Sequence, residues 1–271
     1  MKQFATQKEL FKYLVDNHAD IVTLKKAVIK TADVVSFLPA PIRDGATKAA
    51  RYLYENDEEK GVLKRTIVAN TYNWLDSHQD VHIPGIFSES IAHRGAKSPH
   101  LHDHKFELDA RVGKPIQFYE KEISWRELGQ GKTGMTTALF MESEIRRSMN
   151  DKVFNDYLAD EIDQHSVAMR YIKVALAVND EENYPKEYEE WEKHIKNIGN
   201  RAQAEKQGFF YAIYEAALIE VSAVLLGSNE LTPTLGSKNQ PPESIGLKVN
   251  DPPESNQLMK AIEKLSKTLN H

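Results

Sequence analysis

One carboxylate, Glu220, stands in a run that otherwise suits a buried strand, Leu218 to Asn229. A buried ionised carboxylate costs several kcal/mol unless a partner compensates its charge. Two earlier segments offer partners: residues 99–104 bring alternating histidines, and Ser166 opens an apolar alternation. A histidine, a serine and a buried acid can act as base, nucleophile and orienting group.

Each of these residues also has a simpler interpretation. Glu220 could lie on an edge strand with its polar side toward water, because Ser222 continues the alternation. Ser166 could be a turn hydroxyl at the start of a strand. The residues alone leave both alternatives open.

The histidines suggest a second kind of chemistry. Six of the ten histidines lie within residues 78–104, and the densest group alternates over residues 100–104. On a strand, three alternating side chains share one face. With Asp80 and Asp103 nearby, they could supply zinc ligands, so a metal-dependent hydrolase is an alternative. The simpler interpretation is a set of loop and rim histidines.

Composition narrows the function classes. The chain has 271 residues, 41% of them hydrophobic and 28% charged, which suits one main domain with appendages. The absence of cysteine rules out disulfides, thiolate zinc sites and a cysteine nucleophile. A net charge of -5 with dispersed basic residues gives no reason to expect nucleic acid. No apolar run is long enough to span a membrane, and no secretory leader is recognised, so we expect cytoplasmic synthesis and no membrane partner.

The pattern of elements predicts an α+β fold with three parts. Residues 1–61 form a helical N-terminal extension, residues 62–235 a β-rich core, and residues 236–271 a flexible linker with a C-terminal helix. Strands are expected over 65–71, 80–87, 100–108, 116–123, 135–141, 166–178 and 213–226, and helices over 5–30 (two), 45–55, 142–161, 185–207 and 254–269.

Several ordered pieces of the chain, taken together, resemble the prohead proteases of tailed bacteriophages. These are the HK97-type capsid maturation serine proteases, whose fold is related to herpesvirus assemblin. The resemblance covers about Arg65 to Leu235 and rests on the order and spacing of its pieces. The pieces are Val68-Ala69-Asn70-Thr71, Asp76-Ser77-His78-Gln79-Asp80, Pro84-Gly85-Ile86-Phe87, His102-Asp103, Gly113-Lys114-Pro115, His165-Ser166-Val167, Glu220-Val221-Ser222-Ala223-Val224 and Ser228-Asn229.

The resemblance implies a barrel-like core and a catalytic set of His102, Ser166 and Glu220. His102 matches the histidine of the family's His-Asp motif, Ser166 its nucleophile and Glu220 its strand carboxylate. The sequence departs from the family in two places. Ala168 replaces the usual glycine after Ser-Val, and the run from His102 to Gly113 is longer than usual. The longer run leaves His104 as a rival for the base.

The implied activity is a serine endopeptidase that needs no cofactor or metal. Its substrates would be scaffold and major capsid protein, with self-processing, inside proheads assembling in the host cytoplasm. A homo-oligomer is possible under this resemblance. The alternatives are a catalytically silent capsid scaffolding or structural protein and the metal-dependent hydrolase. The cleavage motif, the oligomeric state and the oxyanion-hole donors stay open.

Overall fold

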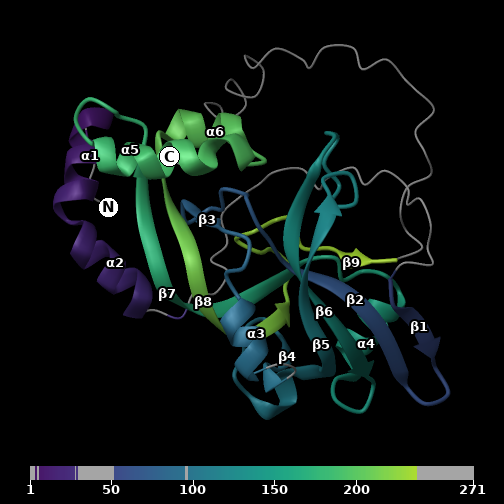
Figure 1. The fold of residues 1–271 in the computed structure, drawn as a ribbon. Coiled ribbons are helices and arrows are strands. Elements are labelled where there is room, and N and C mark those ends of the chain that lie inside the picture. The colour runs from purple at the N-terminus through teal and green to yellow at the C-terminus, as the bar shows by residue number, and fades with distance from the viewer. Residues whose placement is uncertain (1–3, 5, 28, 30–51, 95–96, 237–271) are drawn as a thin grey trace, which may run out of the picture. The chain divides into compact units, whose positions relative to one another are not determined.

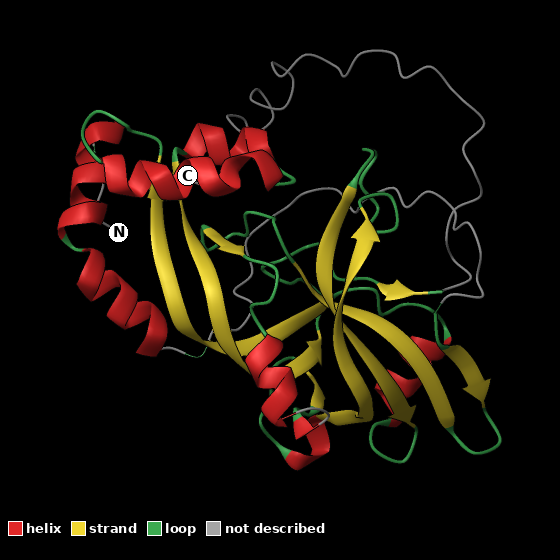
Figure 2. Ribbon diagram, in the orientation of Figure 1, coloured by secondary structure: helices red, strands yellow, loops and turns green. Residues whose placement is uncertain are grey.

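One nine-stranded sheet organises the described part of the computed structural model (Figures 1 and 2). The structure describes residues 4, 6–27, 29, 52–94 and 97–236. The chain divides into two compact units, residues 1–241 and 242–271, and the described residues belong to the first. The predicted helix over 254–269 and, apart from Gly236, the predicted linker over 236–253 lie outside the described residues. Within those residues, no helix is long and apolar enough to cross a membrane.

The order of elements confirms the α+β class. The strands are β1 (Tyr54–Asp57), β2 (Val62–Thr71), β3 (Asp80–His82), β4 (His100–His102), β5 (Arg111–Ser124), β6 (Met135–Arg146), β7 (His165–Val178), β8 (Phe209–Ala223) and β9 (Thr234–Leu235). The α-helices are α1 (Gln7–Asp16), α2 (His18–Ala27), α3 (Ser88–Arg94), α4 (Asp151–Leu158), α5 (Pro185–His194) and α6 (Arg201–Gln207). Single 3₁₀ turns cover Leu108–Ala110 and Ile195–Asn197.

The sheet is open, which corrects the expected barrel-like closure. Its strands run in the order β1-β2-β6-β5-β4-β8-β3, while β7 pairs with β8 and β9 pairs with β2. Within the described residues, no pairing joins β1 back to β3. Barrel closure needs a continuous ring of hydrogen-bonded strands, and this ladder does not complete one.

Strand β8 is the centre of the arrangement that matters for the site. It pairs antiparallel with β7 along its whole length. On its other side, β3 and β4 each pair with it in parallel, over Tyr211–Ile213 and Val221–Ala223 respectively. Most residues of β8 are buried, which fits its almost continuous apolar run. Glu220 is itself fully buried, pairs with Ala168 of β7 and directly precedes the stretch that pairs with β4, so the edge-strand interpretation of Glu220 is wrong.

The N-terminal helices pack on this unit. Phe11 and Leu14 of α1 are buried in the same core cluster as strands β2, β6, β7 and β8. Lys25 of α2 reaches the fully buried Asp80 of β3, with 2.5 Å between Nζ and Oδ1. The Asp80 carboxylate also accepts a 2.8 Å hydrogen bond from the Tyr171 hydroxyl. These contacts join the helices to the core by apolar packing and one buried ion pair.

Three predicted helices are wrong in part. Over Glu142 to Arg146 the chain continues β6, because buried and half-buried residues alternate there with the period of a strand. The helix begins only at Asp151, after the Asn150 side chain caps the Val153 N–H at 3.0 Å.

The predicted helix over 185–207 is divided into α5 and α6. The predicted helix over 45–55 is not helical in its described part, residues 52–55. Gly199 lies between α5 and α6 in the chain. A Cβ there would lie 2.5 Å from the Trp125 ring, so this position needs glycine. Residues 45–51 lie outside the described residues, and β1 begins at Tyr54.

Candidate active site

The buried carboxylate of Glu220 has three hydrogen-bond donors. Its Oε1 accepts from His104 Nδ1 at 2.6 Å and from the Ala168 backbone N–H at 3.0 Å. Its Oε2 accepts from the Ser222 hydroxyl at 2.5 Å. Glu220 is fully buried, so these donors replace the water that the carboxylate loses. The partner that the sequence called for is therefore present, and it is His104.

His104 reaches Glu220 from a tight turn at the end of β4. Asp103 and His104 both have positive φ, 53° and 54°, and the Lys105 N–H donates to the His102 carbonyl at 3.2 Å. Positive φ at both central residues is the pattern of a type I′ turn. The His104 N–H also donates to Ser222 Oγ at 3.1 Å. The predicted strand over 100–108 is thus shortened to 100–102, and the turn carries His104 off the line of β4.

The register of β7, β8 and β4 sorts the candidate residues onto two faces. Ser166 lies opposite Ser222, and Ala168 lies opposite Glu220. Directly opposed residues share a face, so Ser166, Ser222 and Glu220 project to the same side. Leu101 pairs with Ser222 and shares this side.

His102 projects to the other face. It pairs with Ala223, which alternates with Ser222 along β8. Its Nδ1 lies 3.2 Å from Asp103 Oδ2, and 21% of its side chain is exposed. The structure therefore brings Ser166 and Glu220 to one face together with His104, and it separates His102 from them. Of the two histidines that the sequence left as rivals, His104 is the one that contacts Glu220.

Ser166 is held at the start of β7 by its neighbour His165. The Thr232 hydroxyl accepts the His165 N–H at 3.1 Å and donates to the His165 carbonyl at 2.7 Å. A Cβ at Gly227 would lie 2.9 Å from that same carbonyl, so the loop after β8 packs closely against this point. Ser166 itself keeps 6% of its surface exposed.

The three clustered histidines have different partners, which does not suit a shared metal. His100 contacts Ser143 and Tyr157, His102 contacts Asp103, and His104 contacts Glu220. In the part of the chain that the structure describes, no group of three or more His, Asp or Glu side chains could hold a metal ion. Among those described residues, the zinc alternative therefore has no ligand set.

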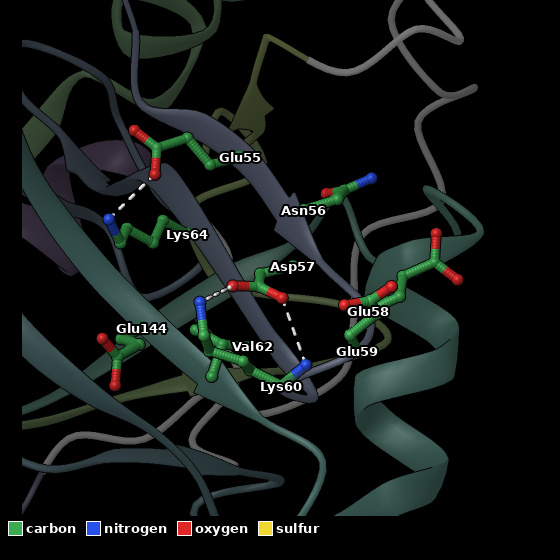
Figure 3. A pocket seen from close by; sticks show the side chains of 9 residues that line it. All are labelled: Glu55, Asn56, Asp57, Glu58, Glu59, Lys60, Val62, Lys64 and Glu144. Carbon is green, nitrogen blue, oxygen red and sulfur yellow. Dashed lines mark hydrogen bonds and ion pairs between the residues drawn. The ribbon is translucent and has the colours of Figure 1, made fainter.

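Two further polar features lie apart from this site. Asp76 and Asp80 are buried together, and burial, then the charge of Asp80, raises the pKa of Asp76 to about 8. The hollow in Figure 3 lies at the β1–β2 hairpin, and its charged side chains are largely paired, as in the 2.7 Å Lys60–Asp57 contact. It is lined by Glu55, Asn56, Asp57, Glu58, Glu59, Lys60, Val62, Lys64 and Glu144.

Burial makes His100 a source of acid sensitivity. Burial, and next the repulsion that a protonated His165 would exert on a second positive charge, hold the pKa of His100 well below its usual 6.5. Below about pH 6.5 the unfolded chain takes up a proton at this residue that the folded protein does not. We therefore expect its contribution to the free energy of unfolding to fall as pH drops, by up to about 1.4 kcal/mol per pH unit.

This expectation is checked by urea unfolding between about pH 7 and about pH 5. His100→Gln should flatten the slope relative to the wild type, whereas His93→Gln, at a site with 76% of the side chain exposed, should keep it. The raised pKa of Asp76 acts in the opposite sense, because its stabilising contribution is lost as pH rises from 3.8 toward about 8. Comparison with the variants removes that background, and equal slopes for His100→Gln and the wild type would contradict the assignment.

Sequence reasoning did not identify Ser222 or the Ala168 N–H as parts of this site. The alternation of Glu220 with Ser222 was the available signal, because both side chains then fall on one face. No protein-family model, curated protein or solved structure matches this chain.

Proposed function

We propose that this chain is a serine endopeptidase with Ser166 as nucleophile, His104 as base and Glu220 as the residue that orients the base. The observation that carries the proposal is the 2.6 Å contact between His104 Nδ1 and the fully buried Glu220 carboxylate, on the sheet face that also bears Ser166. A nucleophile, a base and an orienting acid on one face are the parts that acyl transfer requires.

The contact with Glu220 fixes the tautomer of His104. A carboxylate only accepts hydrogen bonds, so Nδ1 of the ring carries the hydrogen. Nε2 is then the basic nitrogen, and it takes the Ser166 hydroxyl proton as Oγ attacks the peptide carbonyl. The same nitrogen returns the proton to the leaving amine, and Glu220 stabilises the imidazolium formed between these two steps.

Ser222 would act as a positioning residue in this scheme. Its hydroxyl donates to Glu220 Oε2 and accepts the backbone N–H of His104. One side chain thus holds both the acid and the turn that presents the base. Ser222 is fully buried and lies directly across from Ser166.

The biological setting of the proposal comes from the sequence resemblance. A prohead maturation protease would cleave scaffold and capsid protein, and itself, inside an assembling phage shell. The order of the pieces around His102-Asp103, His165-Ser166 and Glu220 supports this setting. The observed open sheet replaces the barrel-like core in the proposal.

Labelling with a fluorophosphonate probe tests the reaction class without a known substrate. We expect the folded wild type to take up one label at Ser166, located by peptide mass spectrometry, because only an activated serine attacks such probes. Heat-unfolded protein and Ser166→Ala should stay unlabelled, and EDTA should have no effect.

Three outcomes would contradict the proposal. An unlabelled wild type would favour the catalytically silent scaffolding protein. A label on Ser222 would move the nucleophile across the sheet. Peptide hydrolysis that EDTA abolishes and zinc restores would favour the metal-dependent hydrolase.

A further inference from the structure

The face of the sheet opposite Ser166 carries a buried chain of hydrogen bonds. His165 Nδ1 lies 2.8 Å from the Thr232 carbonyl oxygen, and His165 Nε2 lies 2.8 Å from the Tyr157 hydroxyl. The same hydroxyl lies 3.2 Å from His100 Nε2, and His100 Nδ1 lies 2.9 Å from Ser143 Oγ. Each of these side chains is at most 1% exposed.

With both imidazole rings neutral, the donor and the acceptor of every hydrogen bond in this chain follow from the Thr232 carbonyl. The Thr232 carbonyl oxygen only accepts, so His165 carries its hydrogen on Nδ1. Its Nε2 then accepts a hydrogen bond from the Tyr157 hydroxyl. His100 must then donate from Nε2 to the phenol oxygen and accept from Ser143 at Nδ1. Each ring nitrogen thus has a partner, and neither imidazole is the proton acceptor for a reaction.

The chain spans β8 and joins the two strands that deliver the proposed reacting groups. His165 pairs with Ala223 from β7, and His100 pairs with Val221 from β4. Strands on either side of β8 are about 9–10 Å apart, too far for the two rings to meet directly. The Tyr157 hydroxyl, at the end of α4, closes that gap.

Each end of the chain adjoins a proposed catalytic residue. His165 directly precedes Ser166, and neighbours on a strand project to opposite faces, so anchoring one fixes the other. His100 lies on the three-residue strand that ends at the turn bearing His104. Gly113 of β5, which pairs with His100, leaves room for this side chain. A Cβ at Gly113 would lie 3.0 Å from His100 Nδ1 and 2.8 Å from Ser143 Oγ.

We propose that His100, Tyr157 and His165 form a positioning chain that fixes the spacing between the Ser166 strand and the His104 turn. This inference rests on the proposed function, because its consequence is for the rate of the serine reaction. The chain lies on the face away from Ser166, so it acts through the placement of the reacting groups. A misplacement of about 1 Å can cost on the order of a hundredfold in rate.

Tyr157→Phe tests the chain because it removes the bridging hydroxyl and keeps the ring. We expect kcat for peptide hydrolysis to fall about tenfold to a hundredfold with KM changed less than about twofold. Tyr72→Phe is the matched control: Tyr72 is also fully buried, and its hydroxyl bonds Glu120 at 2.5 Å, outside the chain. The control should leave kcat unchanged even where it lowers the melting temperature as much.

A second readout needs no activity. ¹⁵N NMR of the imidazoles should show the Nδ1–H tautomer for His165 and the Nε2–H tautomer for His100, and both signals should shift in Tyr157→Phe. If that variant does not fold, Ser143→Ala at the end of the chain should lower kcat about threefold to tenfold. Opposite tautomers in the wild type would contradict the hydrogen-bond directions of the positioning chain, and so the proposal. Expected tautomers with an unchanged kcat in the folded variant would overturn its positioning role and leave the peptidase proposal standing. An inactive wild type with the expected tautomers would sink the peptidase proposal and, with it, the positioning role.

Discussion

Ser166→Ala should abolish peptide hydrolysis while leaving the fold intact. Removal of the nucleophile takes away the covalent step, and the members of such a set act as a unit, so the loss should exceed about a thousandfold. Ser166 is 6% exposed, and its replacement removes one oxygen atom, so the melting temperature should shift by no more than a few degrees. The measurement is the rate of cleavage of a mixed peptide library, followed by mass spectrometry.

Two control variants distinguish loss of the nucleophile from loss of any other serine hydroxyl. Ser222→Ala lies directly across the sheet and removes one of the donors to Glu220. It should lower the rate by an intermediate amount, because His104 and Ala168 still hold the carboxylate. Ser88→Ala, on the exposed hydroxyl that bonds Glu120, should leave the rate unchanged. If Ser166→Ala kept more than about a hundredth of the wild-type rate, Ser166 would not be the nucleophile.

The part of the site that could be predicted is the part that burial alone dictates. Glu220 lies in a run with enough apolar residues to form an enclosed strand, and an enclosed carboxylate needs donors. Burial alone therefore calls for a partner, and of the two segments that offered one, residues 99–104 supply it through His104 and not through the predicted His102.

The choice between His102 and His104 depended on two features that leave little local signal. The turn at Asp103 and His104 needs positive φ at both residues, and neither is glycine or asparagine. The faces are set by the parallel register of β4 on β8, a pairing between segments more than a hundred residues apart in the chain. Such long-range register is decided by packing across the whole sheet.

The hydrogen-bonded chain of His100, Tyr157 and His165 was not predicted, because the sequence periodicity around residues 142–146 was taken as helical. Residues 142–146 alternate as a strand, but their apolar position Ile145 also fits a helical stripe that continues into α4. With the helix begun too early, Tyr157 had no assigned direction. In the structure its hydroxyl bonds both imidazoles.

The open sheet has a similar origin. Composition predicts strands, but closure depends on which edge strands meet, and β7 and β9 pair beside the main path of the sheet. The α+β class was therefore within reach of the sequence, while the barrel was not. The expectations for residues 237–271 remain predictions, because those residues lie outside the described part of the chain.

His104→Ala should be as damaging as the serine change, and His102→Ala should be mild. His104 contacts the buried acid on the face of Ser166, whereas His102 projects to the other face beside Asp103. Loss of the base should lower the hydrolysis rate by more than about a thousandfold, because the serine hydroxyl is a weak nucleophile without it. Loss of His102 should change the rate less than about tenfold.

The pair of variants is its own matched control, because both replace an imidazole within one turn of the chain. His104→Ala leaves the Glu220 carboxylate with Ala168 and Ser222 as donors, so part of any loss could come from stability. Fluorophosphonate labelling of Ser166 at a temperature well below both melting transitions separates the two causes. A folded His104→Ala protein that labels as fast as the wild type, beside an inert His102→Ala protein, would return the base to His102. It would also mean that the Glu220–His104 contact is structural, since a base on the far face of β8 could not use that carboxylate.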